Sequence, residues 1–238
     1  MFGGGTGASS AMEQLLSYLK LRHKELSARV VARLRALREA GLWQPADGTA
    51  DLGAAPPTIS TYHAYAARLV REHALRVGRE PESRLLSEAA AWQVAAEVVT
   101  AYDGPLDEIG KAESTITNAV VDLAGELAEH LVTPAELAGW LDAIDTRLAA
   151  IEAGGKPLLS GSKDMRAALR GRRALVPVLE RFGDLKRRRG ALDFADQMAL
   201  AARIAMRFPE VGIIERARFG AVLLDEFQDT SHAQLQFL

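Results

Sequence analysis

Two adjacent carboxylates near the carboxyl end of the chain, Asp225 and Glu226, have the type and spacing needed to act on a phosphate ester. They follow a compact apolar run, residues 219–224, which is typical of a buried strand in a parallel sheet. We expect the pair at the carboxyl edge of that sheet, where open α/β folds bind ligands. One carboxylate can then hold Mg²⁺, and the other can activate the water that attacks a nucleoside triphosphate. A bare Asp-Glu pair more often caps the next helix, so the pair alone does not establish this chemistry.

A second group of polar side chains lies at a corner between a β-prone run, residues 58–61, and a helix. The helix is predicted over residues 62–77 by its apolar spacing. Thr61 and His63 flank this corner. A lone His in such a place is more often a capping or packing residue, although it can also contact a nucleic-acid backbone. The corner alone therefore leaves both interpretations open.

The elements that must position these residues are mainly helices. Apolar residues recur at helical spacing over residues 11–42, ending at Gly41, and again over residues 62–77. The stretch from Glu88 to Leu185 is rich in Ala, Leu and Glu and predicts several packed helices. Within it, Thr133-Pro134-Ala135-Glu136 predicts a helix start with a capping box. Together with the two strand runs, this pattern predicts a predominantly helical α/β protein.

Composition bounds the class of protein. A chain of 238 residues with 48% hydrophobic residues can build one large or two modest domains. The absence of Cys excludes a disulfide framework and a thiolate metal site. The sequence has no apolar run of about 18 residues and no signal-peptide pattern, so we expect a cytoplasmic protein with no membrane contact.

The charge distribution is more informative than the total. A net charge of −2 argues against a wholly basic protein that coats nucleic acid. Basic residues nevertheless bunch at Arg166–Arg173 and at Lys186–Arg189. Such runs can bind phosphates, but they more often form solvated helix faces. We therefore assign no DNA contact to them.

The segment around the two carboxylates carries a family resemblance. Leu223-Leu224-Asp225-Glu226-Phe227-Gln228-Asp229-Thr230 resembles motif II of the UvrD/Rep/PcrA group of superfamily 1 DNA helicases, whose usual form is Val-Asp-Glu-Phe/Tyr-Gln-Asp-Thr. The resemblance implies that Asp225 is the Mg²⁺ ligand and Glu226 the catalytic base. It also implies that Gln228 couples the γ-phosphate to DNA binding.

Two further segments agree with this family in their order along the chain. Ser60-Thr61-Tyr62-His63-Ala64-Tyr65 resembles its Thr-Phe-His-Ser-Phe motif, which implies that Thr61 and His63 touch the backbone of single-stranded DNA. Leu192-Asp193-Phe194-Ala195-Asp196-Gln197-Met198 resembles the Asp-Phe-Asp-Asp-Leu segment that precedes motif II. We expect the aspartates of the latter segment to pack or cap locally.

The glycine-rich amino end departs from the family pattern. Residues 3–10 resemble the phosphate-binding loop Gly-x-Gly-Ser-Gly-Lys-Thr, which implies nucleotide binding by Gly5, Gly7 and Ser9, but Ala8 stands in the place of the Lys. Without that ammonium group, even a well-formed loop should hydrolyse ATP very slowly. A flexible glycine-rich leader explains the segment equally well.

The resemblance implies an architecture. We expect an incomplete RecA-like parallel sheet of subdomain 1A interrupted by a helical insertion, subdomain 1B. The predicted boundaries are residues 1–85 for the first part of 1A, 86–185 for 1B and 186–238 for the return to 1A.

The resemblance also implies a function, namely ATP-driven 3′ to 5′ unwinding in DNA repair. The cofactors would be ATP and Mg²⁺, and the partners would be single-stranded and duplex-junction DNA and a second helicase or nuclease subunit. We expect this chain to be a fragment that is inactive alone, because of Ala8 and because the second RecA-like domain is not recognisable in it. The alternative is a non-catalytic, mostly helical module that binds DNA or a partner protein.

Overall fold

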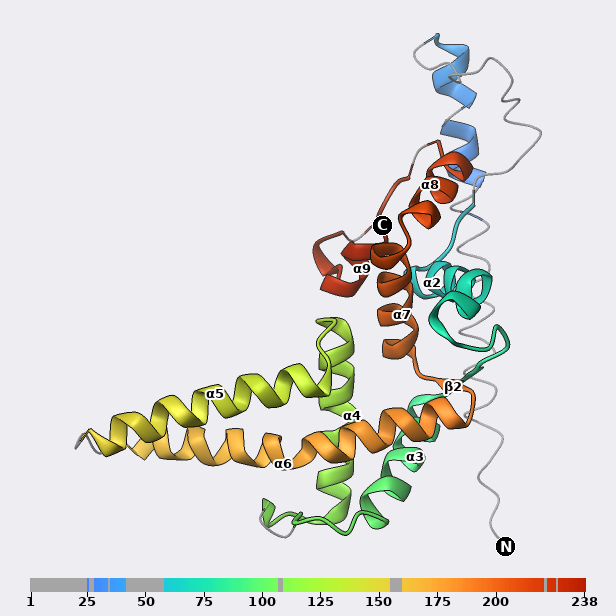
Figure 1. Ribbon diagram of the computed structural model, residues 1–238. Coiled ribbons are helices and arrows are strands. Elements are labelled where there is room, and N and C mark those ends of the chain that lie inside the picture. The colour runs from blue at the N-terminus through green and yellow to red at the C-terminus, as the bar shows by residue number, and fades with distance from the viewer. Residues whose placement is uncertain are drawn as a thin grey trace, which may run out of the picture. The chain divides into compact units, whose positions relative to one another are not determined.

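The computed structural model divides the chain into two compact units, residues 1–61 and residues 62–238 (Figure 1). Within them, the structure describes residues 25, 28–33, 35–41, 58–106, 109–154, 160–220, 222–225 and 227–238.

The first unit is helical at residues 28–33 and 35–39. Gly41 follows this helix with a φ of 69°, a left-handed conformation that glycine adopts without steric cost. Its amide donates to the Arg38 carbonyl at 3.0 Å. The predicted end of the first helical segment at Gly41 is therefore confirmed.

The second unit consists mainly of helices and contains one short pair of parallel strands. Its elements are α2 (Tyr62–His73), η1 (Ala74–Val77), β1 (Arg84–Leu85), α3 (Glu88–Thr100), α4 (Glu113–Glu129), α5 (Pro134–Ala153), α6 (Ser160–Arg188), β2 (Ala191–Leu192), α7 (Phe194–Arg207), α8 (Pro209–Arg218), η3 (Phe227–Asp229) and α9 (His232–Phe237). The strands pair in parallel, with Arg84 opposite Ala191 and Leu85 opposite Leu192. The predicted class, α/β but predominantly helical, is confirmed.

Local capping explains where several of these helices begin. The Thr133 hydroxyl accepts from the Glu136 amide at 3.2 Å, and the Glu136 carboxylate accepts from the Thr133 amide at 2.7 Å. Asp193 and Asp196 form the same reciprocal pair at the start of α7. Both the predicted capping box at Thr133 and the predicted capping role of the aspartates before motif II are therefore confirmed.

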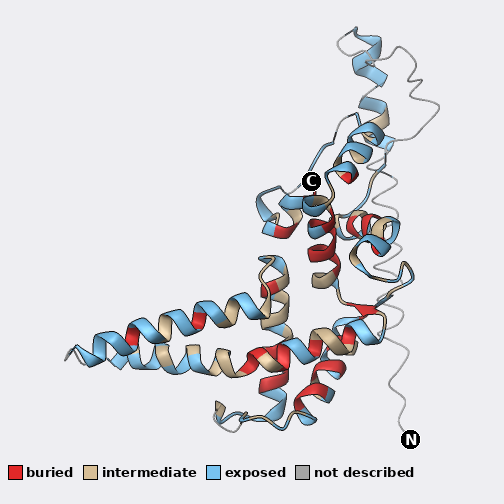
Figure 2. Cartoon of the chain, in the orientation of Figure 1, coloured by how far each residue is buried: buried red, intermediate tan, exposed pale blue. Residues whose placement is uncertain are grey.

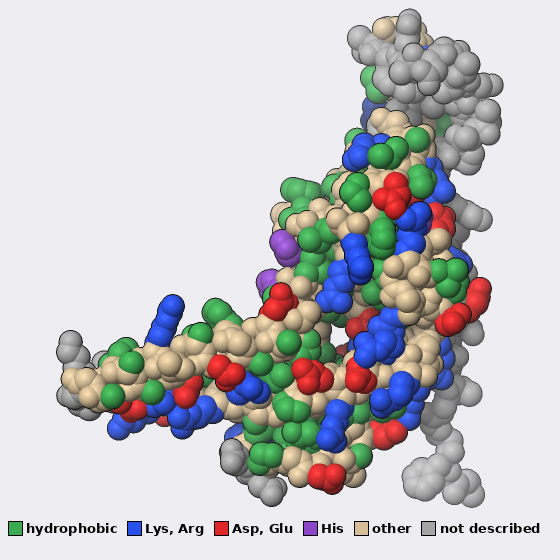
Figure 3. All heavy atoms as spheres, viewed as in Figure 1, with side chains coloured by type: hydrophobic (Ala, Val, Ile, Leu, Met, Phe, Trp, Pro, Cys, Tyr) green, Lys and Arg blue, Asp and Glu red, His purple; other side chains and the backbone are tan. Residues whose placement is uncertain are grey.

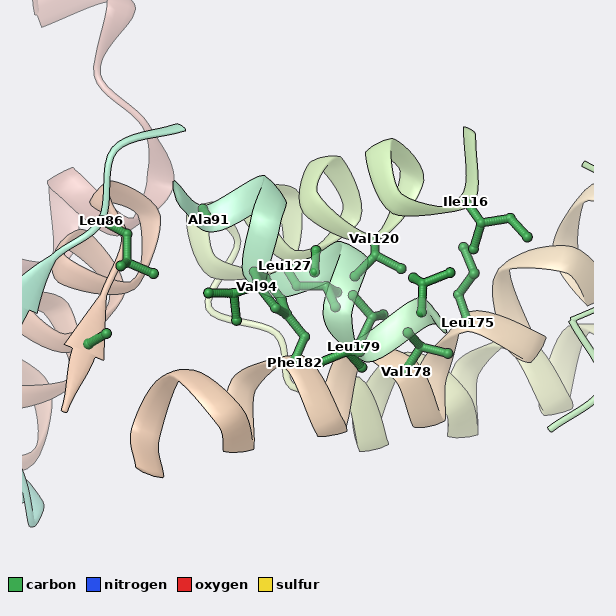
Figure 4. Close-up of a cluster of buried hydrophobic side chains, with 14 residues drawn as sticks. Leu86, Ala91, Val94, Ile116, Val120, Leu127, Leu175, Val178, Leu179 and Phe182 are labelled. Carbon is green, nitrogen blue, oxygen red and sulfur yellow. The ribbon is translucent and has the colours of Figure 1, made fainter. Parts of the chain in front are cut away.

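Helices α3, α4 and α6 enclose one hydrophobic cluster, which we call the α3–α4–α6 cluster (Figure 4). The apolar residues of α3 follow helical spacing and present one buried face. Val120 of α4 and Val178 of α6 are fully buried, and Phe182 is 1% exposed. Burying each side chain of this size contributes about 1.5–3 kcal/mol, so this cluster is a principal source of stability.

A second cluster joins α2, α7 and α9, and we call it the α2–α7–α9 cluster. Leu69 of α2 and Ile204 of α7 are almost completely buried in it, and Phe237 of α9 is 6% exposed. Figure 2 shows buried residues concentrated on α7 and where α3, α4 and α6 cross, whereas α5 is mostly exposed. The second cluster matters for function because it carries the segments described in the next section.

Ion pairs hold α5 against α6. Arg166 and Arg170 contact Asp145 at 2.6 and 3.2 Å, and Arg173 contacts Asp142 at 2.8 Å. The predicted basic run Arg166–Arg173 is therefore largely paired within the protein. In the second run, Lys186 is 3% exposed, so the solvated face expected for Lys186–Arg189 is wrong at this residue.

Both predicted strand runs are wrong. Residues 58–61 and 222–224 have no regular secondary structure. The apolar side chains of Val222, Leu223 and Leu224 are 60%, 83% and 38% exposed, respectively, instead of buried. A strand needs a hydrogen-bonded neighbour, and the only strand pairing in the described part of the chain is the two-residue ladder of β1 and β2. No helix of the described residues is both long enough and apolar enough to span a membrane.

Candidate functional site

The segment with the two predicted catalytic carboxylates lies against the start of α2. The Tyr62 hydroxyl donates to the backbone carbonyl of Asp225 at 3.4 Å and lies 3.4 Å from the Thr230 hydroxyl. Tyr62 is partly buried, whereas Asp225 is exposed. One tyrosine therefore touches both ends of the segment from Asp225 to Thr230.

The segment is also held on its carboxyl side. Ser231 caps α9 by accepting from the Gln234 amide at 3.3 Å, and the Gln234 side chain accepts from the Ser231 amide at 2.9 Å. Ala233 and Phe237 then anchor α9 in the α2–α7–α9 cluster. The turn η3 between Asp225 and α9 is exposed, and Gln228 lies on it.

His63 and Phe194 form an exposed aromatic pair at the starts of two helices. Their ring centroids are 5.5 Å apart and the ring planes are nearly perpendicular, at 85°. His63 lies in the first turn of α2, and Phe194 is the first residue of α7, directly after the capping residue Asp193. The Phe194 side chain is 47% exposed although it is large and apolar. The capping box thus fixes the backbone that presents this ring to solvent.

A charged network fixes the orientation of α2 against α8. Arg68 donates through both terminal nitrogens to Glu215, at 2.5 and 3.1 Å, and the Tyr65 hydroxyl donates to the same carboxylate at 2.8 Å. Arg218 adds a hydrogen bond to Glu215 and another to Glu72, each at 3.1 Å. Burial and then the Glu215 carboxylate raise the pKa of the Tyr65 phenol to about 12.

Aromatic stacking adds to the contacts that hold α2 in place. The Tyr65 ring lies 5.9 Å from the Phe237 ring, at an interplanar angle of 24°. The Arg68 guanidinium lies 4.8 Å from the centre of the Tyr65 ring. These contacts hold α2, α8 and α9 together, so His63 is presented from a rigid support.

The structure brings some of the predicted site residues together. His63 lies in the first turn of α2, and Tyr62, its neighbour in the chain, contacts the backbone carbonyl of Asp225. Thr61 directly precedes α2 in the chain and is exposed. The predicted base Glu226 and the predicted nucleotide-binding residues Gly5, Gly7 and Ser9 lie outside the described residues.

No ready-made metal cage occurs in the described part of the chain. Within it, no group of three or more His, Asp or Glu side chains is arranged to hold a metal ion. Mg²⁺ does not need such a cage, because it usually takes one or two protein carboxylates and fills its other positions with water and substrate phosphates. The exposed Asp225 carboxylate fits that kind of ligation.

Sequence reasoning missed three residues that organise this site. Glu215 carried no motif signal, and its contacts with Tyr65 and Arg68 cross about 150 positions of sequence. Tyr62 and Phe194 belong to recognised segments, but no role was assigned to either. Of the three, only Phe194 had a local sequence signal, which is an aromatic residue directly after Asp193, an aspartate expected to pack or cap.

Comparison with known proteins gives a family match over most of the chain. The family model described as UvrD/REP helicase N-terminal domain matches residues 16–238, which begins after the glycine-rich segment. ATP-dependent DNA helicase UvrD1 of Mycobacterium tuberculosis is 39% identical over 62 residues, covering 26% of this chain and 8% of the relative. The protein of the same name from Mycobacterium leprae is 43% identical over 56 residues, covering 22% of this chain and 7% of the relative. The matched stretches therefore span less than a tenth of these relatives.

Proposed function

The chain belongs to the UvrD/REP helicase N-terminal domain family, and on that premise we propose that it binds single-stranded DNA beside motif II as part of an ATP-driven 3′ to 5′ DNA helicase. Motif II here means Leu223–Thr230. The observation that carries the proposal is the contact of Tyr62 with Asp225. Tyr62 lies between Thr61 and His63, so the residues assigned to the DNA strand adjoin the residues assigned to ATP.

In this proposal the DNA strand lies across the start of α2. The exposed Thr61 hydroxyl and His63 imidazole donate hydrogen bonds to phosphate oxygens, which position the strand without reading its sequence. The exposed ring of Phe194 beside His63 offers a face on which a base can stack. Such stacking contributes about 1–3 kcal/mol per base and tolerates any sequence.

Motif II would supply the ATP side of the site. Asp225 would hold Mg²⁺, which neutralises charge on the β- and γ-phosphate oxygens when bound. Glu226 would orient and deprotonate the attacking water, and Gln228 on the exposed turn η3 would sense the γ-phosphate. Gly5, Gly7 and Ser9 would surround the phosphates. We propose very slow turnover, because Ala8 places a methyl group where the family loop has an ammonium group.

The alternative function is a non-catalytic module that binds DNA or a partner, such as a second helicase or nuclease subunit. It is favoured by the exposure of Leu223, which leaves the support of Asp225 incomplete within the described residues. A module that binds DNA makes the same prediction for DNA binding as the helicase does, whereas a module that binds only a partner predicts no DNA binding. In both cases the alternative differs from the helicase in ATP hydrolysis.

The test of DNA binding is fluorescence anisotropy with a labelled single-stranded oligonucleotide over a series of salt concentrations. A net hydrogen bond contributes about 0.5–1.5 kcal/mol, so Thr61→Ala/His63→Ala should weaken binding roughly tenfold. The matched control is Thr146→Ala/His130→Ala, which removes the same two side-chain types from exposed positions on α5 and at the C-cap of α4. Equal affinities of the two double variants would remove the basis of the proposal.

A further inference from the structure

Three arginines from separate segments of the chain line a pocket that none of the motifs accounts for. Arg79 follows η1, Arg187 lies in the last turn of α6 and Arg203 lies in α7. They line a cavity of about 270 Å³, which we call the Arg79 pocket. On the face shown in Figure 3, Lys and Arg side chains gather beside a hollow between the paired helices α5 and α6 and helix α7. Thr61, His63 and Asp225 do not line this pocket.

The backbone at Arg79 is fixed in place. Gly78 has a φ of 66° and ends η1, and the Arg79 amide donates to the Ala74 carbonyl at 3.0 Å. Gly78 thus ends η1 in a left-handed conformation directly before Arg79. Arg79 therefore reaches the pocket from a defined turn.

The acids of the pocket are mostly committed to other cations. Asp184 pairs with Arg187, and Asp196 pairs at 2.6 Å with Lys186, which also lines the pocket. Glu180 is the third lining carboxylate, and its side chain lies on the exposed face of α6. Four cations thus face three carboxylates, of which two already have partners.

Arg79 and Arg203 differ from Lys186 and Arg187 in forming no ion pair with a described residue. Within the part of the chain that the structure describes, neither forms a hydrogen bond or an ion pair within 4.0 Å through its guanidinium. Burial lowers the pKa of the half-buried Arg79 guanidinium, and although Asp196 opposes this shift, the charges of Arg187 and Arg203 lower it further. Like charges brought together in this way are destabilising unless an anion lies among them.

We propose that the Arg79 pocket binds a phosphate group through Arg79, Arg187 and Arg203. The guanidinium fork matches two phosphate oxygens at once, which makes arginine the preferred side chain for this purpose. The cavity lies just below the roughly 300–1,000 Å³ of pockets that enclose whole small molecules, so its size suits a phosphate group and ordered water. The phosphate can belong to a DNA backbone or to a free anion, and the DNA source rests on the proposed function.

The first arm of the test uses inorganic phosphate and pyrophosphate at matched ionic strength in sodium chloride. Both anions should raise the thermal unfolding midpoint of the unmodified 238-residue chain, because a ligand that binds only the folded state stabilises it. Arg79→Gln/Arg203→Gln should abolish this shift, and Arg79→Lys should reduce it by removing the fork while keeping the charge. The control Arg147→Gln/Arg172→Gln removes the same charge from exposed positions and should keep the full shift.

The second arm measures affinity for a single-stranded oligonucleotide at several salt concentrations. If the phosphate belongs to DNA, Arg79→Gln/Arg203→Gln should weaken binding and reduce the magnitude of the slope of log affinity against log salt by about 1.4. If Arg79→Gln/Arg203→Gln loses the phosphate-induced rise of the unfolding midpoint but keeps its DNA affinity, the pocket binds a free anion. This outcome still supports the proposal. The proposal would be overturned if phosphate did not raise the unfolding midpoint of the unmodified chain. It would also be overturned if the rise were equal in Arg79→Gln/Arg203→Gln and Arg147→Gln/Arg172→Gln. If the unmodified chain binds no DNA, the proposed function fails while the first arm still decides this proposal.

Discussion

Lys186 is the one charged residue among the described residues that is almost completely buried, with 3% of its surface exposed. Its ammonium lies 2.5 Å from Asp193 and 2.6 Å from Asp196, and 4.3 Å from the centre of the Phe182 ring. Burial is the largest influence on Asp196 and raises the pKa of its carboxyl, although Lys186 opposes this shift. Lys186 therefore pairs with both carboxylates that cap α7.

Replacing Lys186 should destabilise the protein strongly. Lys186→Met keeps most of the side-chain volume but leaves two carboxylates without their cation, and breaking a buried pair in this way costs about 3–5 kcal/mol. The free energy of unfolding can be measured by chemical denaturation followed by circular dichroism. The control Lys163→Met changes an exposed residue and should stay within about 0.5 kcal/mol of the unmodified chain. Equal losses in the two variants would contradict a structural role for Lys186.

Asp145 predicts a stability that depends on pH in the acid range. Hydrogen bonds from Arg166, and then from Arg170, lower the pKa of its carboxyl from 3.8 to about 2. A folded-state pKa below the unfolded one means that the contribution is complete above the unfolded value and is lost as the pH falls toward about 2. Asp145→Asn should therefore lower the thermal unfolding midpoint at pH 7 and leave it nearly unchanged at pH 2.

The control for Asp145 is Asp164→Asn, which removes an exposed carboxylate from α6. It should have little effect at either pH. A midpoint difference for Asp145→Asn that is the same at pH 7 and at pH 2 would contradict the assigned ion pairs.

At the scale of elements, capping determines helix starts and hydrogen-bonded neighbours determine strands. The starts of α5 and α7 depend on side chains three residues apart, Thr133 with Glu136 and Asp193 with Asp196. Such local chemistry can be predicted from a short stretch of sequence. The run ending at Leu224 has the composition of a strand, but a strand also depends on partners elsewhere in the chain.

In the candidate site, too, local spacing predicts some features and long-range packing determines others. The motif II residues and the corner at His63 were recognisable because their spacing is local. The Tyr62 hydroxyl contacts the Asp225 carbonyl across 163 positions, and no pattern in either segment encodes that contact. Long-range packing therefore sets the part of the site that sequence could not predict.

The exposure of Leu223 gives a direct test at this scale. Leu223→Ala should change the free energy of unfolding by less than about 0.5 kcal/mol, because the side chain is 83% exposed. Leu179→Ala is the matched change in the α3–α4–α6 cluster, where the side chain is 4% exposed, and should cost about 2–5 kcal/mol. A large loss for Leu223→Ala would mean that the segment is buried as a strand after all.

At the scale of the second unit, β2 joins the two hydrophobic clusters. Successive side chains of a strand point to opposite faces. Accordingly, Ala191 packs in the α3–α4–α6 cluster, and Leu192, the next residue, packs in the α2–α7–α9 cluster. Lys186 lies in the last turn of α6, which precedes this strand, and Asp193 follows the strand directly. Within this unit, α2, which carries His63, and α9, which follows motif II, pack in the second cluster. The boundaries of subdomains 1A and 1B, at residues 85/86 and 185/186, stay a prediction.

The whole chain should show no DNA-stimulated ATP hydrolysis. Turnover requires positive charge on the phosphates and a fixed Mg²⁺ ligand. Ala8 supplies no charge at the loop, and the apolar residues before Asp225 are exposed rather than held in a sheet. Addition of single-stranded DNA should therefore not increase phosphate release, either by the unmodified chain or by Glu226→Gln. Ala8→Lys tests whether the missing positive charge is the cause. If ATP hydrolysis appears in Ala8→Lys and disappears in Ala8→Lys/Glu226→Gln, the missing ammonium group alone limits the chain. Activity in the unmodified chain that is abolished by Glu226→Gln would contradict the prediction and favour a working motor over a non-catalytic module.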